Sequence, residues 1–598
     1  MQRSWFRTVF VPTLLAAALA VPAATANAPK QKQQPPPPAA IAKVPTAVGT
    51  GGAAASVDVL ATEAAVKALR KGANAVDAAV VAAAVLGVTE PFSCGIGGGG
   101  FMVIRTADGE VTTIDGRETA PQAMRPDSFW EGGAPLPFND ARFSGLSAGV
   151  PGTVETWDEA LRRFGTMKLR QALKPGIAVA RKGFVVDQTF FDQTLANVDF
   201  FDDVPSTEEI YLDADGTPRD VGTVLRNPDL ARAYDRIARK GANGFYRGAI
   251  ASAMVRAVTR PPIAADANHV WRPGVMTVRD VKRYEAPERA PTRIGYRGLD
   301  VYGMGPPSSG GSTVGEALNI LEGFSLTAAE RTRAFHLYLE ASRFSFADRN
   351  AYLADSDFFD VPLDGLLSDG FAAERRALID PTRAATSPVP PGDPYPYDTA
   401  GEASVTAAQS ETTTHLTVAD KWGNVVSYTF TIESTGGNGI VVPGWGFLLN
   451  NELTDFNFDS LTHPNRVEGG KRPRSSMSPT IVLDDGEPLL ALGSPGGSTI
   501  ITTVLQLLVD RLDLGATLPE AIAAPRATQR NTASTLAEAA FLSSPEGQEL
   551  AAAYGHVLAL TGEIGAATAI EFLGGGRLLA AAEPERRGGG SAAVVRPE

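Results

Sequence analysis

Cysteine, histidine and net positive charge are all scarce in this chain of 598 residues. The single cysteine, Cys94, rules out a disulfide within the chain and a cysteine-rich metal site. The five histidines form no HExxH motif and no close pair along the sequence, so we predict no zinc site. The formal net charge of -13 argues against a nucleic-acid partner, because such a partner needs a basic surface. With 44% hydrophobic residues, the composition is that of a globular protein with a large core.

The N-terminus has the pattern of an export signal. Arg3 and Arg7 precede an apolar run over residues 9–24, and small residues follow. We predict a signal peptide over residues 1–26, ending at an A-x-A site at Ala26, and hence a periplasmic or extracellular protein. A retained membrane anchor is the alternative, although the run is short for a spanning helix. Residues 27–44 are rich in proline and glutamine, which predicts an extended linker.

Apolar spacing and turn residues predict helices in the first part of the chain and hairpins in the later part. Residues 57–89 are alanine-rich and predict two helices separated at Gly72 and Asn74. Hairpins are expected around Asp108-Gly109, around Gly423-Asn424 and around Asp485-Gly486. Residues 387–404 are rich in proline, glycine and small polar residues, and predict an exposed loop or disordered segment. Alternating sheets and helices suggest an α/β sandwich.

Three consecutive threonines, Thr412, Thr413 and Thr414, stand between that loop and a predicted strand. A threonine hydroxyl is a weak nucleophile unless a base lies beside it. When threonine is the first residue of a chain, its own α-amine can act as that base. Such a site requires a precursor cut just before the threonine. The ordinary alternative is that the threonines are β-forming residues at a strand edge.

Two pairs of small residues stand just before predicted elements. Ser475 and Ser476 precede a predicted strand, and Gly496 and Gly497 precede a predicted helix. Free backbone amides at such a helix start suit a developing oxyanion. Glycines are also common in any tight turn between a strand and a helix, so this signal alone is weak.

Charged residues supply candidates for binding an amino-acid head group. Glu452 and Asp455 could hold an ammonium group, or they could simply form a solvated acidic loop. Arg117 could bind a carboxylate through two parallel hydrogen bonds, or it could be a surface charge. Together with a nucleophile and an oxyanion site, these residues would fit a γ-glutamyl compound.

Nine motifs in order make the chain resemble a known family. They are "GANAVDAAVVAAA", "GIGGGGFM", "DGRETAP", "GVPGTVETW", "PPSSGG", "TTHLTVADKWGN", "LLNNELTDF", "RPRSSMSPTIV" and "GSPGGSTIIT". The chain resembles the γ-glutamyltransferase (glutathione hydrolase) family of N-terminal-nucleophile enzymes from about residue 45 to 595. The resemblance implies a four-layer αββα fold. It also implies autocleavage between Thr412 and Thr413, giving a large subunit (45–412) and a small catalytic subunit (413–598) that stay associated as a heterodimer.

The resemblance also assigns roles to individual residues. Thr413, two residues before His415, is the implied nucleophile, and Thr431 is the threonine that assists it. Glutathione or another γ-glutamyl compound is the implied donor, water, an amino acid or a dipeptide is the acceptor, and no metal or organic cofactor is implied. The implied groups are Arg117, Ser475 and Ser476 for the α-carboxylate, Glu452 and Asp455 for the α-ammonium, and the amides of Gly496 and Gly497 for the oxyanion.

Three features depart from the family pattern. Glu433 stands where many members carry an asparagine near the substrate. The segment from Asp455 to Ser475 is shorter than in members with a lid over the pocket, which predicts an open site. The C-terminal "AEPERRGGGSAAV" replaces the usual D-P-R-type loop. Two other functions therefore remain open: a related acylase acting on glutaryl-type β-lactams or other amides, and an inactive homologue that binds a ligand.

Overall fold

One thirteen-stranded sheet that doubles back on itself forms the centre of the fold. The structure, a computed structural model, describes residues 42–398 and 413–598. The signal peptide, most of the linker and Thr412 therefore lie outside the described residues. In order across the sheet, the strands are β8 (Glu288–Arg289), β3 (Val111–Asp115), β2 (Gly99–Arg105), β12 (Val425–Thr431), β11 (Thr414–Asp420), β1 (Thr46–Ser56), β19 (Arg577–Ala582), β18 (Thr568–Phe572), β14 (Glu487–Gly493), β13 (Thr480–Asp484), β10 (Leu299–Gly303) and β9 (Thr292–Tyr296), with β20 (Ser591–Pro597) also paired to β1.

Strand β1 bends in the middle and so belongs to both halves of the sheet. Its residues 46–50 pair with β19, and its residues 52–56 pair with β11. At the bend, Gly51 and Gly52 adopt φ angles of 87° and 125°, which residues with a side chain rarely adopt. The two halves then face each other, since the Ser427 hydroxyl of β12 donates to the Leu492 carbonyl of β14 at 2.9 Å. The result is two β layers.

A first helical layer covers the half of the sheet that holds β2, β11 and β12. Helix α2 is buried all round, and it begins with a capping box in which Asn74 and Asp77 each accept a hydrogen bond from the other's backbone amide. Trp157, on α4, is fully buried in the same core. Helices on this side include α1 (Val59–Arg70), α2 (Ala75–Thr89), α4 (Thr153–Arg163), α5 (Leu169–Ala172), α6 (Lys174–Lys182), α7 (Gln188–Leu195), α8 (Val198–Phe201), α9 (Pro205–Tyr211), α10 (Pro228–Lys240), α11 (Asn243–Tyr246), α12 (Ala249–Thr259) and α13 (Val278–Arg283).

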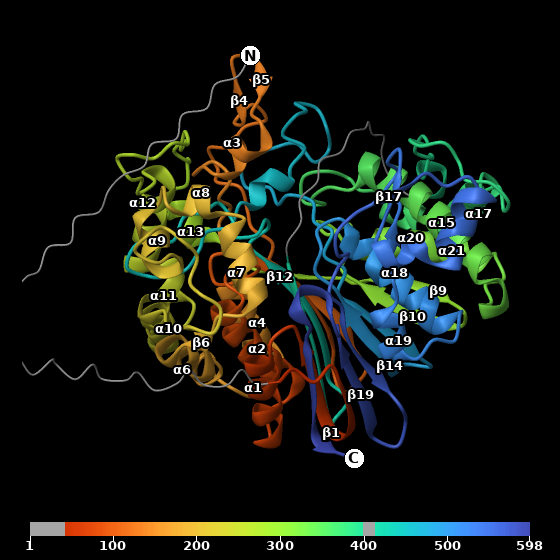
Figure 1. Ribbon diagram of the computed structural model, residues 1–598, viewed down its shortest axis with the longest axis horizontal. Helices are drawn as coiled ribbons and strands as arrows, with labels where there is room; N and C mark the ends of the chain where they lie inside the picture. Colours follow the sequence, from red (N-terminus) through yellow and green to blue (C-terminus); the bar gives the residue numbers. More distant parts are fainter. Residues whose placement is uncertain (1–41, 399–412) are drawn as a thin grey trace, which may run out of the picture. The chain divides into compact units, whose positions relative to one another are not determined.

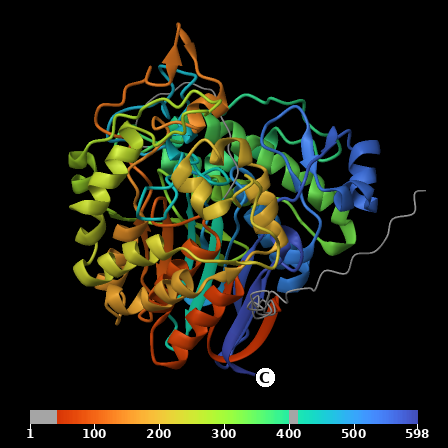
Figure 2. The ribbon, with the colours of Figure 1, turned by 60° about the vertical axis from the view of Figure 1, so that its left-hand side comes forward.

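A second helical layer covers the other half of the sheet. In Figure 1 the orange and yellow helices of the first layer lie on one side of the sheet and the green and blue helices of the second on the other, and Figure 2 keeps this separation after a turn. The layers therefore run α, β, β, α, which confirms the predicted sandwich. Helices on this second side include α14 (Gly310–Glu322), α15 (Arg331–Tyr352), α17 (Asp369–Ala377), α18 (Thr499–Leu512), α19 (Leu518–Ala523), α20 (Ala539–Ser543) and α21 (Pro545–Ala552).

Most of the predicted local elements are present. The pair α1 and α2 and the hairpins β2–β3, β11–β12 and β13–β14 all occur where the turn residues predicted them. Of the predicted loop at 387–404, the described part carries only a 3-10 turn at Tyr395–Tyr397, and residues 399–404 lie outside the description. Among the described residues, no helix has the length and apolar character needed to cross a bilayer.

Strands from both sides of the 399–412 segment alternate within one sheet. Strand β11, which begins one residue after Thr413, lies between β1 and β12, and β12 pairs in turn with β2. A cut between Thr412 and Thr413 would leave these backbone hydrogen bonds intact. Strand pairing would thus hold together the two parts that such a cut produces.

Replacing Gly52 with alanine should destabilise the protein. A Cβ there would face the Ala419 carbonyl at 3.0 Å and would force a rare φ on the new side chain. We expect a loss of about 1–3 kcal/mol of unfolding free energy, measured by urea unfolding. Gly295→Ala in β9 is the matched control, because nothing lies within 4 Å of its added Cβ. Equal urea midpoints for the two variants would contradict the role of the bend.

Candidate active site

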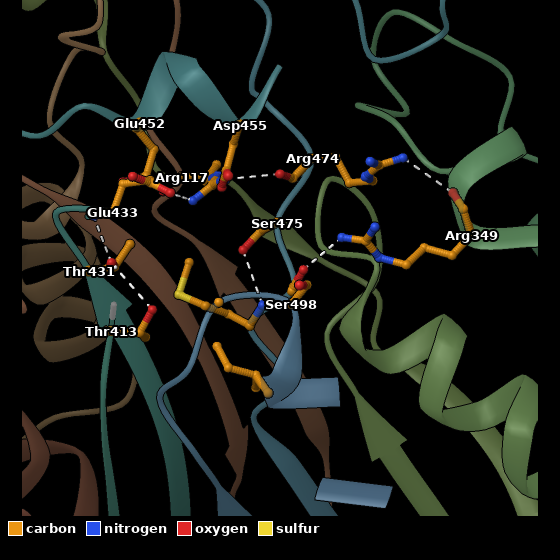
Figure 3. A pocket seen from close by; sticks show the side chains of 14 residues that line it. Arg117, Arg349, Thr413, Thr431, Glu433, Glu452, Asp455, Arg474, Ser475 and Ser498 are labelled. Carbon is orange, nitrogen blue, oxygen red and sulfur yellow. Dashed lines mark hydrogen bonds and ion pairs between the residues drawn. The ribbon is translucent and has the colours of Figure 1, made fainter. Parts of the chain in front are cut away.

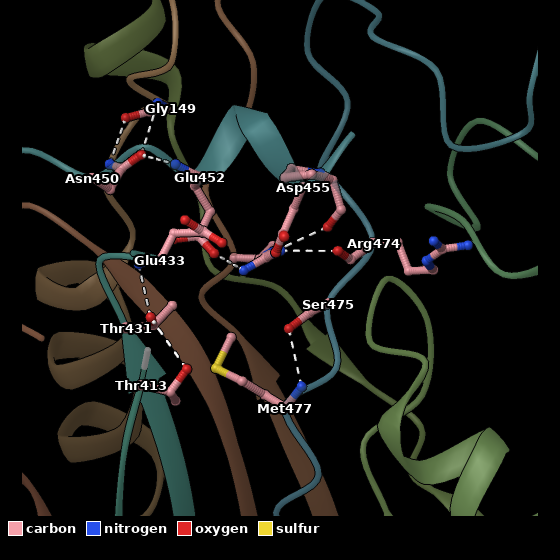
Figure 4. A network of polar contacts seen from close by, with 12 residues as sticks. Gly149, Thr413, Thr431, Glu433, Asn450, Glu452, Asp455, Arg474, Ser475 and Met477 are labelled. Atoms are coloured by element: carbon pink, nitrogen blue, oxygen red, sulfur yellow. Dashed lines mark hydrogen bonds and ion pairs between the residues drawn. The ribbon is translucent and has the colours of Figure 1, made fainter. Parts of the chain in front are cut away.

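The start of β11 places Thr413 opposite the end of β12. Because Thr414 pairs with Phe430 in the antiparallel register, the next residues outward, Thr413 and Thr431, face each other. Their hydroxyls lie 3.4 Å apart, with that of Thr413 donating, and the Glu433 amide donates to the Thr431 hydroxyl at 2.8 Å. Figure 4 shows this series of contacts from Thr413 to Glu433. Thr431 is thereby fixed as the neighbour of the candidate nucleophile.

His415 is not available as a general base. It is fully buried, and its ring nitrogens contact the hydroxyls of Thr429 and Thr417 at 2.8 and 3.1 Å. Burial lowers the pKa of His415 to about 3, so the ring stays neutral. Its role is to fix the strand behind Thr413.

Arg117 is held rigidly at the far wall of the same cavity. It follows β3, and its guanidinium donates to the carbonyls of Pro473 and Arg474 at 3.0 Å each. The guanidinium also forms ion pairs with Glu452 and with Asp455, on the short helix Glu452–Asp455 (Figure 3). Burial alone would lower the pKa of Arg117, but these carboxylates raise it overall. The proposed carboxylate-binding and ammonium-binding groups thus lie in direct contact.

Two further buried glutamates complete an acidic cluster. Glu118 and Glu452 are both fully buried, and desolvation raises the pKa of both carboxyl groups. Burial raises the pKa of Glu118 to about 8. Burial, followed by the charges of Asp455 and Glu452, also raises the pKa of Glu433 well above its usual range. Sequence reasoning missed Glu118, although it directly follows Arg117.

Two arginines that the sequence did not single out line the serine side of the cavity. Arg349, on α15, donates to the Ser476 hydroxyl at 2.6 Å, and Arg474 donates to the Arg349 carbonyl at 3.3 Å. The Ser475 hydroxyl accepts from the Met477 amide at 3.2 Å. Ser476 therefore receives a hydrogen bond from a buried cation. No local pattern marks Arg349, because it lies in the last turn of a helix that is buried nearly all round.

The turn between β14 and α18 has the backbone freedom that an oxyanion site requires. Gly496 and Gly497 adopt φ angles of 131° and 55°, and their carbonyls accept from the first amides of the helix. Within the described residues, neither glycine amide donates a backbone hydrogen bond. Gly497 lines the same cavity as Thr413, whereas Gly496 lines the adjoining cavity of about 210 Å³.

The structure brings nearly all the predicted residues to one small polar cavity of about 30 Å³. Two predicted site residues are exceptions: Gly496 does not line this cavity, and Thr412 lies outside the described residues. The cavity is lined by Arg117, Arg349, Thr413, Thr431, Glu433, Glu452, Asp455, Arg474, Ser475, Ser476, Met477, Gly497, Ser498 and Ile500.

Two histidines that are distant in the sequence meet in the second helical layer. His336 Nδ1 lies 2.9 Å from His556 Nε2, and Glu340 lies close enough for the three to offer ligand atoms within 4.8 Å of one another. Because the two histidines are 220 positions apart in the chain, their spacing in the sequence could not reveal this pair. Glu340 already accepts from Arg343 and from the Ala385 amide, so its carboxylate is engaged within the protein. Desolvation by burial lowers the pKa of both histidines.

Comparison with known proteins identifies the family. The family model described as gamma-glutamyltranspeptidase matches residues 61–594. A glutathione hydrolase proenzyme of Bacillus subtilis (strain 168) is 39% identical over 80% of this chain and 81% of its own length. Acylase ACY 1 proenzyme of Pseudomonas sp. (strain SE83) is 35% identical over 80% of this chain and 83% of its own length. A crystal structure of cephalosporin acylase from Bacillus halodurans superposes with a TM-score of 0.81 at 26% identity, over 96% of this chain and 100% of the other. With the family model and the relatives agreeing over most of its length, the chain belongs to the gamma-glutamyltranspeptidase family.

Proposed function

We propose that the protein is an exported, self-processing γ-glutamyl hydrolase and transferase whose nucleophile is Thr413. The observation that carries the proposal is the shared cavity. The Thr413 hydroxyl opens onto the same small space as Arg117, Glu452 and Asp455, and the Gly497 backbone also borders it. A γ-glutamyl group presents an α-carboxylate, an α-ammonium and, a few bonds away, a carbonyl carbon. The cavity has a group for each.

The charges of the cavity favour a zwitterionic head group. Arg117 now contacts both Glu452 and Asp455. A ligand carboxylate can form an ion pair with the guanidinium of Arg117. A ligand ammonium can then pair with the two acids that Arg117 releases, so every buried charge keeps a partner. Ser475 and Ser476 border the same space, and Arg349 keeps the Ser476 hydroxyl in place.

The proposed reaction has two steps. After the precursor is cut before Thr413, its free α-amine takes the hydroxyl proton while the oxygen attacks the γ-carbonyl carbon. The amides of Gly496 and Gly497 stabilise the oxyanion. The carbon–nitrogen bond then breaks, the leaving amine receives the proton, and a γ-glutamyl ester of Thr413 remains. Water or an acceptor amine cleaves that ester by the same route in reverse.

The first prediction concerns processing. Purified protein should yield two fragments, and the smaller should begin at Thr413 when measured by intact mass. Thr413→Ala should remain one chain, because the hydroxyl that starts the cut is gone. Thr413→Ser retains a hydroxyl and should still be cut. An uncut wild-type chain that is folded by circular dichroism would contradict the proposal.

A second function is favoured by the similarity to the two acylases. The donors γ-glutamyl-p-nitroanilide and glutaryl-p-nitroanilide differ only in the α-amine, so the ratio of their kcat/KM values separates the two activities. Because Glu452 and Asp455 flank Arg117, we expect the γ-glutamyl compound to be preferred by at least about 100-fold. Preference for the glutaryl compound would identify an acylase, and turnover of neither by cut protein would identify a binding protein.

Asp455 supplies the third prediction. Asp455→Asn should lower kcat/KM for the γ-glutamyl donor about 30- to 1,000-fold, mainly through KM, because it removes a carboxylate proposed to bind the α-ammonium of the donor. Asp459→Asn, at an exposed position of the same segment, is the control and should leave the kinetics unchanged. The acylase hypothesis predicts no loss with the glutaryl donor. Equal kinetics for the two variants would exclude Asp455 from the ammonium site.

Glu433 supplies a prediction of pH dependence. Burial raises the pKa of Glu433 well above its usual range and so favours the protonated carboxyl, and Glu433→Gln should retain kcat/KM within about threefold near neutral pH. Above the raised pKa, wild-type Glu433 becomes charged and the glutamine does not, so the activity ratio of variant to wild type should change with rising pH. A ratio that stays constant from pH 6 to 10 would show that Glu433 does not titrate in this range.

A further inference from the structure

The backbone of Thr413 is held by an arginine from the far end of the chain. Arg587 Nη1 donates to the Thr413 carbonyl at 2.7 Å, and Nη2 donates to the Ser93 hydroxyl at 2.6 Å. The guanidinium also lies 3.8 Å from the Glu90 carboxylate. One cation therefore bridges the candidate nucleophile and the segment that follows helix α2. Arg587 lies in the C-terminal "AEPERRGGGSAAV" segment, but its sequence predicted no role for this arginine.

The position of Arg587 is fixed by its own backbone. The residue adopts φ 56°, in the left-handed region, within the short turn Arg586–Gly588. Its amide donates to Glu563 at 2.8 Å, and the preceding Arg586 forms buried ion pairs with Glu538 and Glu583. A non-glycine residue in this conformation costs free energy, and it persists only where its surroundings hold it there. The turn thus points the guanidinium at Thr413.

The α-nitrogen of Thr413 must lie close to this cation. Within one residue, the backbone nitrogen and the carbonyl oxygen are about 3 Å apart, so the guanidinium nitrogen is at most about 6 Å from the nitrogen of Thr413. Once the chain is cut before Thr413, that nitrogen becomes an amine that can carry a positive charge. Two cations at this separation repel each other in a partly buried site.

We propose that Arg587 is a positioning residue that keeps the α-amine of Thr413 unprotonated, and so active as a base, near neutral pH. The inference rests on the proposed function, in which this amine accepts the hydroxyl proton. A neighbouring cation disfavours the protonated amine and lowers its pKa by about one unit or more at this distance. The carbonyl contact also fixes the residue that carries both base and nucleophile.

The acid that pairs with Arg587 is only partly charged near neutral pH. Burial raises the pKa of Glu90 to about 7, so this carboxyl carries only part of a charge there. Burial raises the pKa of Glu433, on the other side of Thr413, which favours its neutral form. His415 is neutral. Other charged or titratable groups also face this region. Glu563 lies beside the Arg587 amide, and the groups around Glu90 are Asp58, Lys43, Asp187 and Cys94. Across the cavity lie the ion-paired Arg117, Glu452 and Asp455, together with Arg349 and Arg474.

The experiment is the pH profile of kcat/KM for γ-glutamyl-p-nitroanilide, measured on protein shown by intact mass to begin its small fragment at Thr413. In Arg587→Gln the amine pKa should rise, so the acid limb should move up by about one pH unit. Activity should fall about tenfold at the foot of that limb and recover at higher pH. Arg587→Lys should keep the limb near its wild-type position. Arg577→Gln, an exposed arginine that pairs with Glu598, is the control.

Glu90 gives an independent test with the opposite sign. Glu90→Gln leaves Arg587 in place and removes the acid that partly screens it. The acid limb should therefore move to lower pH, whereas in Arg587→Gln it moves to higher pH. This variant also keeps the proposal testable if Arg587→Gln fails to fold or is not cut. A purely structural role would lower activity equally at all pH values in both variants.

The cavity beside Arg587 permits chemical rescue. Arg587 lines the space of about 210 Å³ that also borders Gly496 and Glu563. In Arg587→Ala, added guanidinium ion at concentrations far below those that unfold proteins should enter this space and return the acid limb toward its wild-type position. Sodium at equal ionic strength should not.

The outcomes separate this inference from the proposed function. A cut, active wild-type protein with unshifted acid limbs in both Arg587→Gln and Glu90→Gln would overturn the role of Arg587 and leave the function standing. Failure of the wild-type protein to cut or to turn over the donor would overturn the proposed function itself. Opposite shifts in the two variants would establish the electrostatic role.

Discussion

The antiparallel pairing of β11 with β12 is the constraint on which the site depends. It sets Thr413 opposite Thr431. The flanking strands β1 and β2 fix the register of β11 and β12, because a shift of one residue would turn every side chain of the shifted strand to the opposite face of the sheet. Both flanking strands come from the part of the chain before residue 399. The sheet therefore holds the candidate nucleophile in place whether or not the chain is continuous before it.

Charge balance is the second organising principle. Arg117, Arg349 and Arg474 are buried around one small cavity, together with Glu118, Glu433, Glu452 and partly buried Asp455. Buried ions are tolerated only when they are paired or neutralised. Arg117 pairs with two acids, while burial raises the pKa of Glu118 and of Glu433 and so favours their neutral forms. Such a site suits a ligand that carries one charge of each sign, because ion pairs within the site can be replaced by ion pairs with the ligand. No buried charge is then left unpaired.

Much of the site could be predicted from the sequence, because its motifs are short and each carries its own local geometry. The Asp-Gly and Gly-Asn turns located the hairpins, and the glycine pair located the turn before α18. Strand β1 was missed because its glycine- and alanine-rich sequence lacks the β-branched pattern of a strand, and its pairing partners determine its structure. Glu118, Arg349 and Arg587 were missed for a related reason: their roles come from contacts with segments more than one hundred residues away.

The central claim is that Thr413 carries the γ-glutamyl group during turnover. The most direct measurement is acid quenching of the enzyme during turnover of a γ-glutamyl donor, followed by mass spectrometry of its peptides. The peptide beginning at Thr413 should gain the mass of one γ-glutamyl group. It should lose this group when an acceptor amine is added before quenching. Turnover with the modification at another residue would contradict the account.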